Sequence, residues 1–253
     1  MSPLTQQLNA LGFRGLAAQL DDLVALATKK RWGAVEIFEH VAQLETKDRA
    51  QRSLDRRLSR SKLGRFKPIV DFDWSWPKRV DREGVEAALK LDFLREARNL
   101  ILVAPPGLGK TTLAKNIAHQ VILAGHSAHF VTAAQLLLDL GAQDSPRALD
   151  RRLRHYCRAS LLVIDEVGYL SYDNRSADLL FEVVSRRYEK KSLLLTTNLP
   201  FRDWPTIFPN AACVTALIER LIHHADVIAI EGDSYRRRDA EARKSSRRTR
   251  PTE

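Results

Sequence analysis

The sequence predicts an α/β fold, in which helices flank a five-stranded parallel sheet and a small all-helical domain precedes it. Two observations support this prediction. From residue 80 onward, short apolar runs alternate with helical patterns, which is the order that builds a parallel sheet. Up to about residue 64, apolar residues recur at helical spacing. A chain of 253 residues, 44% of them hydrophobic, can bury one such core and a smaller attachment.

The amino-terminal part, residues 1–64, is predicted to be the helical domain. Leu4, Leu8 and Leu11 repeat at helical spacing, and a second set of leucines follows a break at Gly12. A third apolar stripe, after residue 33, continues into a basic stretch. Helical packing is therefore expected here, with the basic stretch available to a DNA or protein partner.

Residues 65–79 are predicted to be a linker. Phe72, Trp74 and Trp76 alternate with polar residues in this segment, as they would in an extended strip. Aromatic rings beside basic residues can stack on unpaired bases. We favour the alternative, in which the rings anchor the linker on a neighbouring domain.

Residues 80–235 are predicted to hold the parallel sheet. Five apolar runs supply its strands: residues 100–103, 129–132, 161–165, 193–197 and 227–230. Helical patterns fill the gaps, most clearly over residues 175–190. From residue 236 the chain is polar and basic, so residues 236–253 are predicted to be a flexible tail.

A glycine-containing loop follows the first of these runs. Residues 104–111 read Ala-Pro-Pro-Gly-Leu-Gly-Lys-Thr and directly precede a helical pattern. Glycines let backbone N–H groups turn toward phosphate oxygens, while the helix dipole and Lys110 add positive charge and Thr111 can ligate Mg²⁺. The residues predicted to bind a nucleotide's phosphates are Pro106, Gly107, Leu108, Gly109, Lys110, Thr111 and Thr112.

The usual first glycine of this motif is Ala104 here. We interpret the change as tolerated, because Gly107 and Gly109 still supply the close turns. Taken alone, the loop could also be a chance match. Ala104 likewise leaves open a DNA-binding module with a vestigial nucleotide pocket.

Carboxylates end the run at residues 161–164. Phosphoryl transfer needs positioned charge more than covalent chemistry, so Asp165 is assigned to the metal ion and Glu166 to the attacking water. The alternative is an ordinary strand closed by an acidic turn. Asn198 ends the next run and is a candidate sensor of the γ-phosphate, or else a turn former before Pro200.

The net charge of +10 is concentrated in three segments: residues 47–67, 147–158 and 236–253. Such clustering indicates polyanion binding, although each cluster singly could be a solvated helix face or a disordered tail. No base-reading constellation is evident, so we expect duplex DNA to be bound with little sequence preference. The residues assigned to this contact are Arg49, Arg52, Arg56, Arg57, Arg151, Arg152 and Arg154.

Other sites and locations are disfavoured. Cys157 and Cys213 lack the spacing of a disulfide framework or a zinc site. His223 and His224 have no ligand-type partner at helical spacing, so they are expected at a helix surface or interface rather than on a metal. Neither a leader pattern nor a membrane-length apolar run occurs, and a cytoplasmic location with no membrane partner is expected.

Six segments together resemble the IstB family of transposase helper ATPases, which belong to the AAA+ class near the DnaC helicase loaders and DnaA initiators. They are Gly-Leu-Gly-Lys-Thr-Thr-Leu-Ala, Leu-Val-Ile-Asp-Glu-Val-Gly-Tyr-Leu, Ser-Arg-Arg-Tyr-Glu, Leu-Thr-Thr-Asn-Leu-Pro-Phe, Glu-Arg-Leu-Ile-His-His-Ala-Asp-Val-Ile and Gly-Asp-Ser-Tyr-Arg. The resemblance covers nearly the whole chain. It implies a three-layer α/β/α P-loop NTPase that binds ATP and Mg²⁺ between adjacent subunits and hydrolyses the ATP. It also implies assembly on duplex DNA and delivery of the target DNA to a cognate transposase.

The resemblance also implies roles for two arginines. Arg220 falls at the position of an arginine finger that acts on a neighbouring subunit, or else makes a surface salt bridge with Glu219 or a nearby acid. Arg236 is a candidate second sensor, or simply begins the basic tail. A DnaC-like replicative helicase loader remains the alternative function. A metabolic kinase is disfavoured because no acceptor site or lid is evident.

Overall fold

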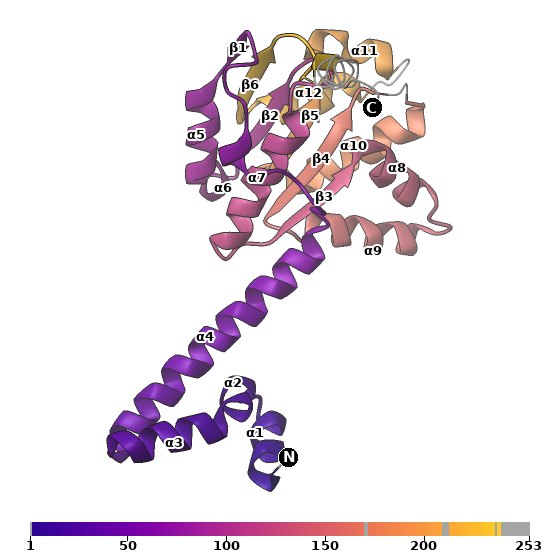
Figure 1. Cartoon of the computed structure of the whole chain (residues 1–253). Coiled ribbons are helices and arrows are strands. Elements are labelled where there is room, and N and C mark those ends of the chain that lie inside the picture. Colours follow the sequence, from indigo (N-terminus) through magenta and orange to yellow (C-terminus); the bar gives the residue numbers. More distant parts are fainter. Residues whose placement is uncertain (1, 170–171, 209–212, 236, 239–253) are drawn as a thin grey trace, which may run out of the picture. The chain divides into compact units, whose positions relative to one another are not determined.

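The computed structural model describes residues 2–169, 172–208, 213–235, 237 and 238. The chain divides into two compact units, Met1–Ser59 and Arg60–Glu253. Helix α4, Ala34–Ser61, ends just past this division (Figure 1). Each unit is described by itself.

The amino-terminal unit is helical, as predicted. It contains α1 (Pro3–Ala10), α2 (Arg14–Ala18), α3 (Leu20–Lys30) and most of α4. Glu45 of α4 is 5% exposed, and its carboxylate accepts a hydrogen bond of 2.8 Å from the backbone N–H of Leu16 in α2. Gly15 leaves room for this approach, because a Cβ there would lie 2.7 Å from Cβ of Asp48. The Glu45 carboxylate thus links α4 to α2, and Gly15 allows the two helices to pack closely.

The second unit contains a six-stranded sheet in the order β1-β6-β2-β5-β4-β3. Its strands are β1 (Arg79–Val80), β2 (Asn99–Val103), β3 (Ala128–Thr132), β4 (Leu161–Val167), β5 (Ser192–Thr197) and β6 (Ala225–Glu231). The five predicted strands are all present and pair parallel with one another. The short strand β1, which pairs antiparallel with β6, was not predicted. It spans the boundary between the predicted linker, which ends at Arg79, and the domain expected from residue 80. Because β1 has only two residues, the sequence shows no apolar run there from which a strand could be predicted.

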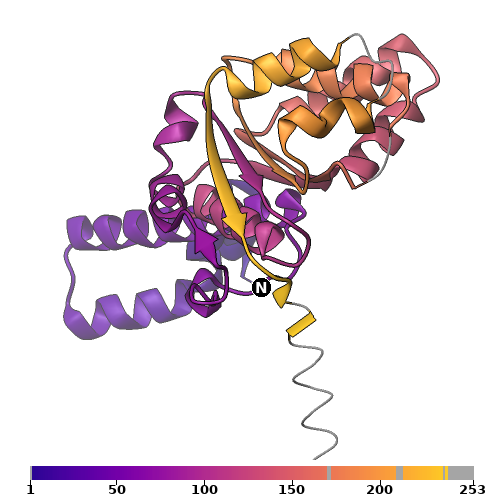
Figure 2. The same ribbon diagram turned by 90° about the horizontal axis from the view of Figure 1, so that it is seen from above.

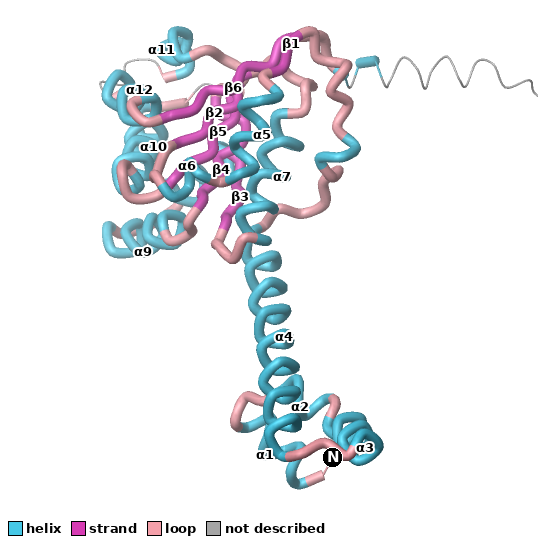
Figure 3. Tube along the Cα trace, turned by 90° about the vertical axis from the view of Figure 1, so that its left-hand side faces the viewer, coloured by secondary structure: helices cyan, strands magenta, loops and turns pink. Residues whose placement is uncertain are grey.

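Helices cover both faces of this sheet (Figure 3). They are α5 (Arg82–Lys90), α6 (Asp92–Arg95), α7 (Lys110–Leu123), α8 (Ala133–Gly141), α9 (Pro146–Cys157), α10 (Asn174–Arg187), α11 (Trp204–Ile207) and α12 (Val214–Ile222). Helices α5 and α7 lie on one face and α10 and α12 on the other, which is the expected three-layer α/β/α arrangement. Among the helices of the described ranges, none combines the length and apolarity that a transmembrane span requires.

The segment after β6 extends beyond the sheet. Figure 2 shows the yellow strand β6 leading into this segment, which begins at Gly232. Gly232 has a φ of 149°, and a Cβ there would lie 3.0 Å from the backbone nitrogen of Lys78. The chain therefore turns tightly past the residues that precede β1.

A buried arginine joins the carboxyl end of α10 to two strands. Arg187 is 0% exposed, and its guanidinium donates hydrogen bonds to the carbonyl oxygens of Cys157, Ala159, Ser160 and Ser192. Burial lowers the pKa of this guanidinium to about 10. These bonds satisfy backbone groups of the turn before β4 and of the start of β5.

Candidate functional site

The loop between β2 and α7 requires its two central glycines. Gly107 and Gly109 have φ values of 85° and 86°, a region that side chains disfavour. A Cβ on Gly107 would lie 2.2 Å from Oγ of Ser234, and one on Gly109 would lie 2.7 Å from Cε2 of Phe72. Both conformation and space therefore exclude larger residues.

Ala104 keeps an ordinary negative φ. It is 2% exposed, and its N–H donates a hydrogen bond of 3.1 Å to the carbonyl of Thr197 in β5. The loop thus closes on the sheet without a glycine at this position.

One cavity of this unit is lined by all seven residues predicted to bind phosphates: Pro106, Gly107, Leu108, Gly109, Lys110, Thr111 and Thr112. Lys110 is the first residue of α7, and its Nζ donates hydrogen bonds of 2.5 Å and 3.0 Å to the carbonyls of Ala104 and Pro105. The ammonium group is thereby held over the loop, beside the N–H groups at the helix start. This is the arrangement of an anion-binding site.

Asp165 lies behind Thr111 rather than in the cavity wall. Asp165 is 2% exposed. Its carboxylate accepts a hydrogen bond of 2.5 Å from Oγ1 of Thr196 and one of 3.0 Å from Oγ1 of Thr111. A carboxylate and a hydroxyl held this close are oxygen donors of the kind that Mg²⁺ prefers. The residues present therefore fit the ion predicted for this position.

Glu166 faces the cavity because β4 is irregular at this point. The pairing of β4 with β5 shifts register between Ile164 and Val167, and Glu166 has a φ of 63°. Its N–H donates a hydrogen bond of 2.9 Å to Oγ1 of Thr196, which holds the unusual backbone in place. Such a conformation costs roughly 1–3 kcal/mol in a residue other than glycine, and strain of this kind is typical of functional sites.

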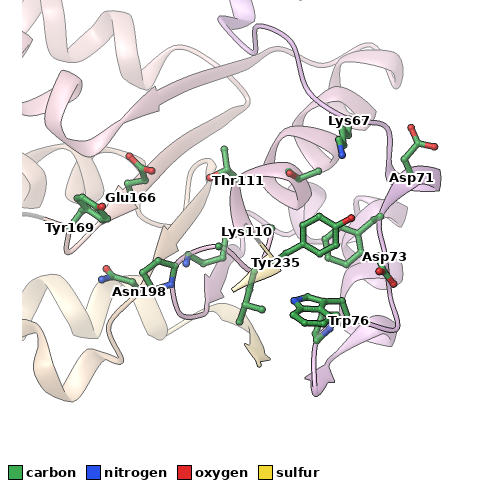
Figure 4. Close-up of a pocket in the computed structure, with 17 residues that line it drawn as sticks. Lys67, Asp71, Asp73, Trp76, Lys110, Thr111, Glu166, Tyr169, Asn198 and Tyr235 are labelled. Atoms are coloured by element: carbon green, nitrogen blue, oxygen red, sulfur yellow. The ribbon is translucent and has the colours of Figure 1, made fainter. Parts of the chain in front are cut away.

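Asn198 lines the same cavity. It directly follows β5, which lies between β2 and β4, so three neighbouring strands deliver the loop, the carboxylates and the amide to one edge. Two groups of side chains face each other in Figure 4, with Lys110 between them: Glu166, Tyr169 and Asn198 on one side, and Asp73, Trp76 and Tyr235 on the other.

The second of these groups was not predicted from the sequence. We call residues 65–77 the strap, because this segment crosses the cavity and forms one of its walls. Phe72 and Trp76 line the cavity from the strap, and Tyr235 lines it from the segment after β6. The only signal for the strap in the sequence is the alternation of aromatic and polar residues. That alternation indicates an anchored linker and does not reveal which surface the rings cover.

The strap is fixed to the loop-bearing unit at both ends. Asn116 of α7 donates a hydrogen bond of 2.9 Å to the carbonyl of Lys67. At the other end, Nε1 of Trp76 donates a hydrogen bond of 2.8 Å to the carbonyl of Asp233. The aromatic linker therefore does anchor on its neighbouring domain, as the favoured interpretation predicted.

A charged contact adds to this closure. Arg238 lies 4.4 Å above the ring of Trp76, and its Nη1 is 3.3 Å from Oδ2 of Asp73. The hydroxyl of Ser75 lowers the pKa of the Asp73 carboxyl, and its backbone N–H and Arg238 lower it further. The ionised carboxylate thus lies opposite the guanidinium of Arg238.

Arg220 is not among the residues that line this cavity. It lies in α12, where its Nη1 donates to Oγ of Ser185 and its guanidinium lies 4.6 Å above the ring of Phe181. Within the described residues it makes no ion pair, so the alternative of a salt bridge with Glu219 is not observed. Arg236 lies outside the described residues.

The predicted DNA-binding arginines of α4 are Arg49, Arg52, Arg56 and Arg57. Two of them contact acids of the same helix: Nε of Arg49 is 3.6 Å from Glu45, and Nε of Arg52 is 2.6 Å from Asp48. Arg49 nevertheless has a side chain that is 59% exposed, and Arg56 is exposed. These two remain accessible to a partner.

The predicted arginines of α9 differ in their surroundings. Arg152 donates to Asp139 and lies 5.1 Å from the ring of Tyr156, while Arg154 is 2.6 Å from Asp150. Arg151 is exposed. Arg152 therefore joins α9 to α8, which is a structural role that the sequence analysis did not anticipate.

Comparison with known proteins agrees with this geometry. The model of the family "IstB-like ATP binding protein" matches residues 6–243. The chain is 34% identical over 236 residues to the "Insertion sequence IS21 putative ATP-binding protein" of Pseudomonas aeruginosa, covering 93% of this chain and 89% of that relative. It is 33% identical to the corresponding IS232 protein of Bacillus thuringiensis subsp. berliner, covering 93% and 94%.

Two solved structures have a similar fold. A crystal structure of DnaI aligns with a TM-score of 0.55 and 19% identity, covering 68% of this chain and 92% of DnaI. The replication initiator DnaA bound to AMPPCP and single-stranded DNA aligns with a TM-score of 0.51 and 17% identity, covering 68% and 52%. The AAA+ fold expected from the sequence is thus confirmed. Since a family match spans nearly the whole chain, this protein belongs to the family of IstB-like ATP-binding proteins.

Proposed function

We propose that this protein binds and hydrolyses ATP, assembles on duplex DNA while ATP is bound, and helps a transposase of the same insertion element to use that DNA. The observation that carries the proposal is the convergence of Lys110, Glu166 and Asn198 on one cavity, with Thr111 and Asp165 bonded beside it. The names of the relatives, ATP-binding proteins of insertion sequences, supply the context.

The phosphate side of the cavity supports the proposed ATP chemistry. Lys110 and the N–H groups at the start of α7 would bind the β- and γ-phosphates. Thr111 and Asp165 would hold Mg²⁺, which supplies positive charge to the transferring phosphoryl group. Glu166 would orient a water for attack, and Asn198 would contact the γ-phosphate.

The aromatic side of the cavity supports a nucleoside as the remainder of the ligand. Phe72, Trp76 and Tyr235 line the cavity beside the phosphate loop and offer aromatic surfaces to a ligand. Stacking against a purine buries such surfaces. Lys110 and Trp76 would therefore act at opposite ends of one ATP molecule.

Arg220 supports a site shared between subunits. Its guanidinium lies beside Phe181 and Ser185, outside the cavity of its own chain. An arginine that reaches a neighbour's γ-phosphate contributes about 10³ to 10⁵ to the rate in well-studied nucleotide hydrolases. We propose this role for Arg220 in an ATP-dependent homo-oligomer.

For DNA, we propose contacts from Arg49, Arg52, Arg56, Arg57, Arg151 and Arg154, with residues 1–64 as the main DNA- and partner-binding part. Arg152 is left out of this proposal because Asp139 and Tyr156 engage it. Contacts of this kind read the phosphate backbone rather than the bases. A helicase loader would share this architecture. Capture of the purified protein by a cognate transposase, and not by a replicative helicase, would support the transposition role.

Calorimetry with ATP and Mg²⁺ tests the cavity directly. Replacing Lys110 by alanine removes the charge over the loop, so nucleotide binding should disappear while the circular dichroism spectrum stays unchanged. Lys115→Ala is the matched control, because Lys115 is on the same helix but lies 4.9 Å from the ring of Phe130, away from the cavity. Equal ATP affinity of Lys110→Ala and the wild type would refute the site.

Mixing two inactive variants tests the shared site. Lys110→Ala keeps Arg220 but cannot bind ATP in its own cavity. Arg220→Ala keeps an intact cavity but lacks the arginine. Their mixture, with DNA present, should release phosphate faster than either variant alone, because some neighbours pair an intact cavity with an intact arginine. A mixture no faster than its components would show that Arg220 does not act between subunits.

A further inference from the structure

Three metal-ligating side chains meet on the surface of the second unit, away from the ATP cavity. Glu189, His223 and His224 each offer one ligand atom, and these three atoms lie within 4.8 Å of one another. Nε2 of His224 is 3.5 Å from Oε1 of Glu189, and the two imidazole rings are 4.0 Å apart between centroids.

The backbone that carries Glu189 is held firmly. Glu189 has a φ of 56°, a left-handed conformation, in the turn that follows α10. The carbonyl of Arg187 accepts hydrogen bonds of 2.9 Å from the N–H groups of both Lys190 and Lys191. Since the side chain of Arg187 is anchored in the core, this turn presents Glu189 in a fixed place.

The two histidines are equally well supported. The N–H of His223 donates a hydrogen bond of 2.9 Å to the carbonyl of Glu219, which continues α12. The carbonyl of His224 accepts a hydrogen bond of 2.7 Å from the N–H of Asn99 at the start of β2. The ligands therefore come from rigid elements, as a preorganised site requires.

A neighbouring hydroxyl orients one of the rings. The hydroxyl of Tyr188 is 2.8 Å from Nδ1 of His223. Such an outer contact fixes an imidazole and leaves Nε2 as the nitrogen that can bind a metal ion. Tyr188 thus supports a ligand without binding the ion itself.

We infer that Glu189, His223 and His224 form a binding site for a transition-metal dication of the zinc class. Two imidazoles and one carboxylate are the donors that Zn²⁺ accepts, with a further coordination position left for water. Mg²⁺ prefers oxygen ligands, so this site differs in kind from the one at Thr111 and Asp165. No ligand spacing in the sequence predicts it, because Glu189 comes from a different element than the histidines.

The site shares a surface with Arg220. A shallow pocket beside it is lined by Tyr188, Glu219, Arg220, Ile222 and His223. Tyr188 connects the two groups, because the guanidinium of Arg220 lies 6.0 Å from its ring while its hydroxyl contacts His223. A bound dication would therefore add positive charge beside the proposed intersubunit arginine.

Zinc titration of the full-length protein tests this inference. The protein carries no histidine tag, is stripped with chelator, and is kept in saturating Mg²⁺ so that the oxygen site is occupied. Calorimetry should report one Zn²⁺ per chain. His224→Ala and Glu189→Gln should each weaken the binding by ~10-fold or more, and Tyr188→Phe by about 10-fold.

Two variants serve as controls for this titration. His126→Ala removes an exposed histidine elsewhere, so it should bind Zn²⁺ as the wild type does. Lys110→Ala should also be unaffected, which separates this site from the ATP cavity. Absence of Zn²⁺ uptake by the wild type would overturn the inference. So would unchanged binding by His224→Ala and Glu189→Gln, both checked for folding by thermal melts.

Discussion

Glu166 concentrates two unusual properties in one residue of the cavity. Its backbone is left-handed and tied to Thr196, while its carboxylate is exposed at the wall beside Asn198. Packing does not account for this strained turn, since the side chain is exposed. The geometry instead suits a group that must reach a ligand.

Glu166→Gln should separate binding from hydrolysis. The amide keeps the shape of the side chain and its backbone bond to Thr196, so ATP affinity should be preserved. Loss of the base should slow phosphate release by about 10² to 10⁴. Glu83→Gln, at an exposed position of helix α5, is the matched control and should have no effect. Undiminished turnover of Glu166→Gln would remove Glu166 from the mechanism.

Individual residues were predictable where their chemistry is local in sequence. Lys110 and Thr111 belong to one short motif, and Glu166 follows a run that could only be a buried strand. Trp76 and Tyr235 escaped prediction as cavity residues because they reach the loop from distant segments, through contacts such as the bond of Trp76 to Asp233. Tertiary contacts of this type leave no spacing in the sequence.

The strap is the element that turns an open phosphate loop into a cavity with two walls. It begins just after α4 and ends just before β1, and bonds to α7 and to Asp233 hold it across the loop. Phe72 also occupies the space that a side chain at position 109 would need. Strap and loop are therefore fitted to each other.

Trp76→Ala should loosen this wall. The variant removes the hydrogen bond to Asp233, the edge contact with Tyr235 and the cation–π contact with Arg238. Fluorescence titration with an ATP analogue should show affinity reduced about tenfold, equivalent to ~1.4 kcal/mol, because both stacking surface and closure are removed. Trp32→Ala, in the amino-terminal unit, should bind as the wild type does. Equal affinities for the two variants would exclude the strap from binding.

Elements were predictable in proportion to their length and periodicity. All five parallel strands follow from apolar runs, and α10 from its apolar stripe. The two-residue strand β1 has no such pattern and forms only because β6 offers an edge to pair with. The bulge at Glu166 was also invisible, since it arises from how β4 meets β5.

Across the whole molecule, the arginines that carry the positive charge fall into two groups, those that are exposed and those that other side chains engage. Some arginines, such as Arg151, are exposed, while Arg152 is engaged by Asp139 and Tyr156. Net charge alone therefore overstates what is available to DNA. Only the accessible part should contribute to counterion release.

The salt dependence of duplex binding tests this distinction. Log affinity should fall linearly with log salt, more steeply with ATP than without it because an ordered oligomer brings more arginines to the DNA. Arg151→Ala should reduce the slope by about 0.9 for each DNA phosphate that the arginine neutralises. Arg152→Ala should instead lower the melting temperature and leave the slope nearly unchanged. A flat profile for the wild type would contradict backbone binding.

The position of the strap in the chain also has a mechanical consequence. Ten residues separate the end of the basic helix α4 at Ser61 from Phe72, which touches the phosphate loop. This segment forms a wall of the cavity, so any movement of it would act on that helix through the connecting stretch. The proposed DNA binding by α4 and the proposed ATP hydrolysis are thus expected to be coupled through the chain segment that connects them.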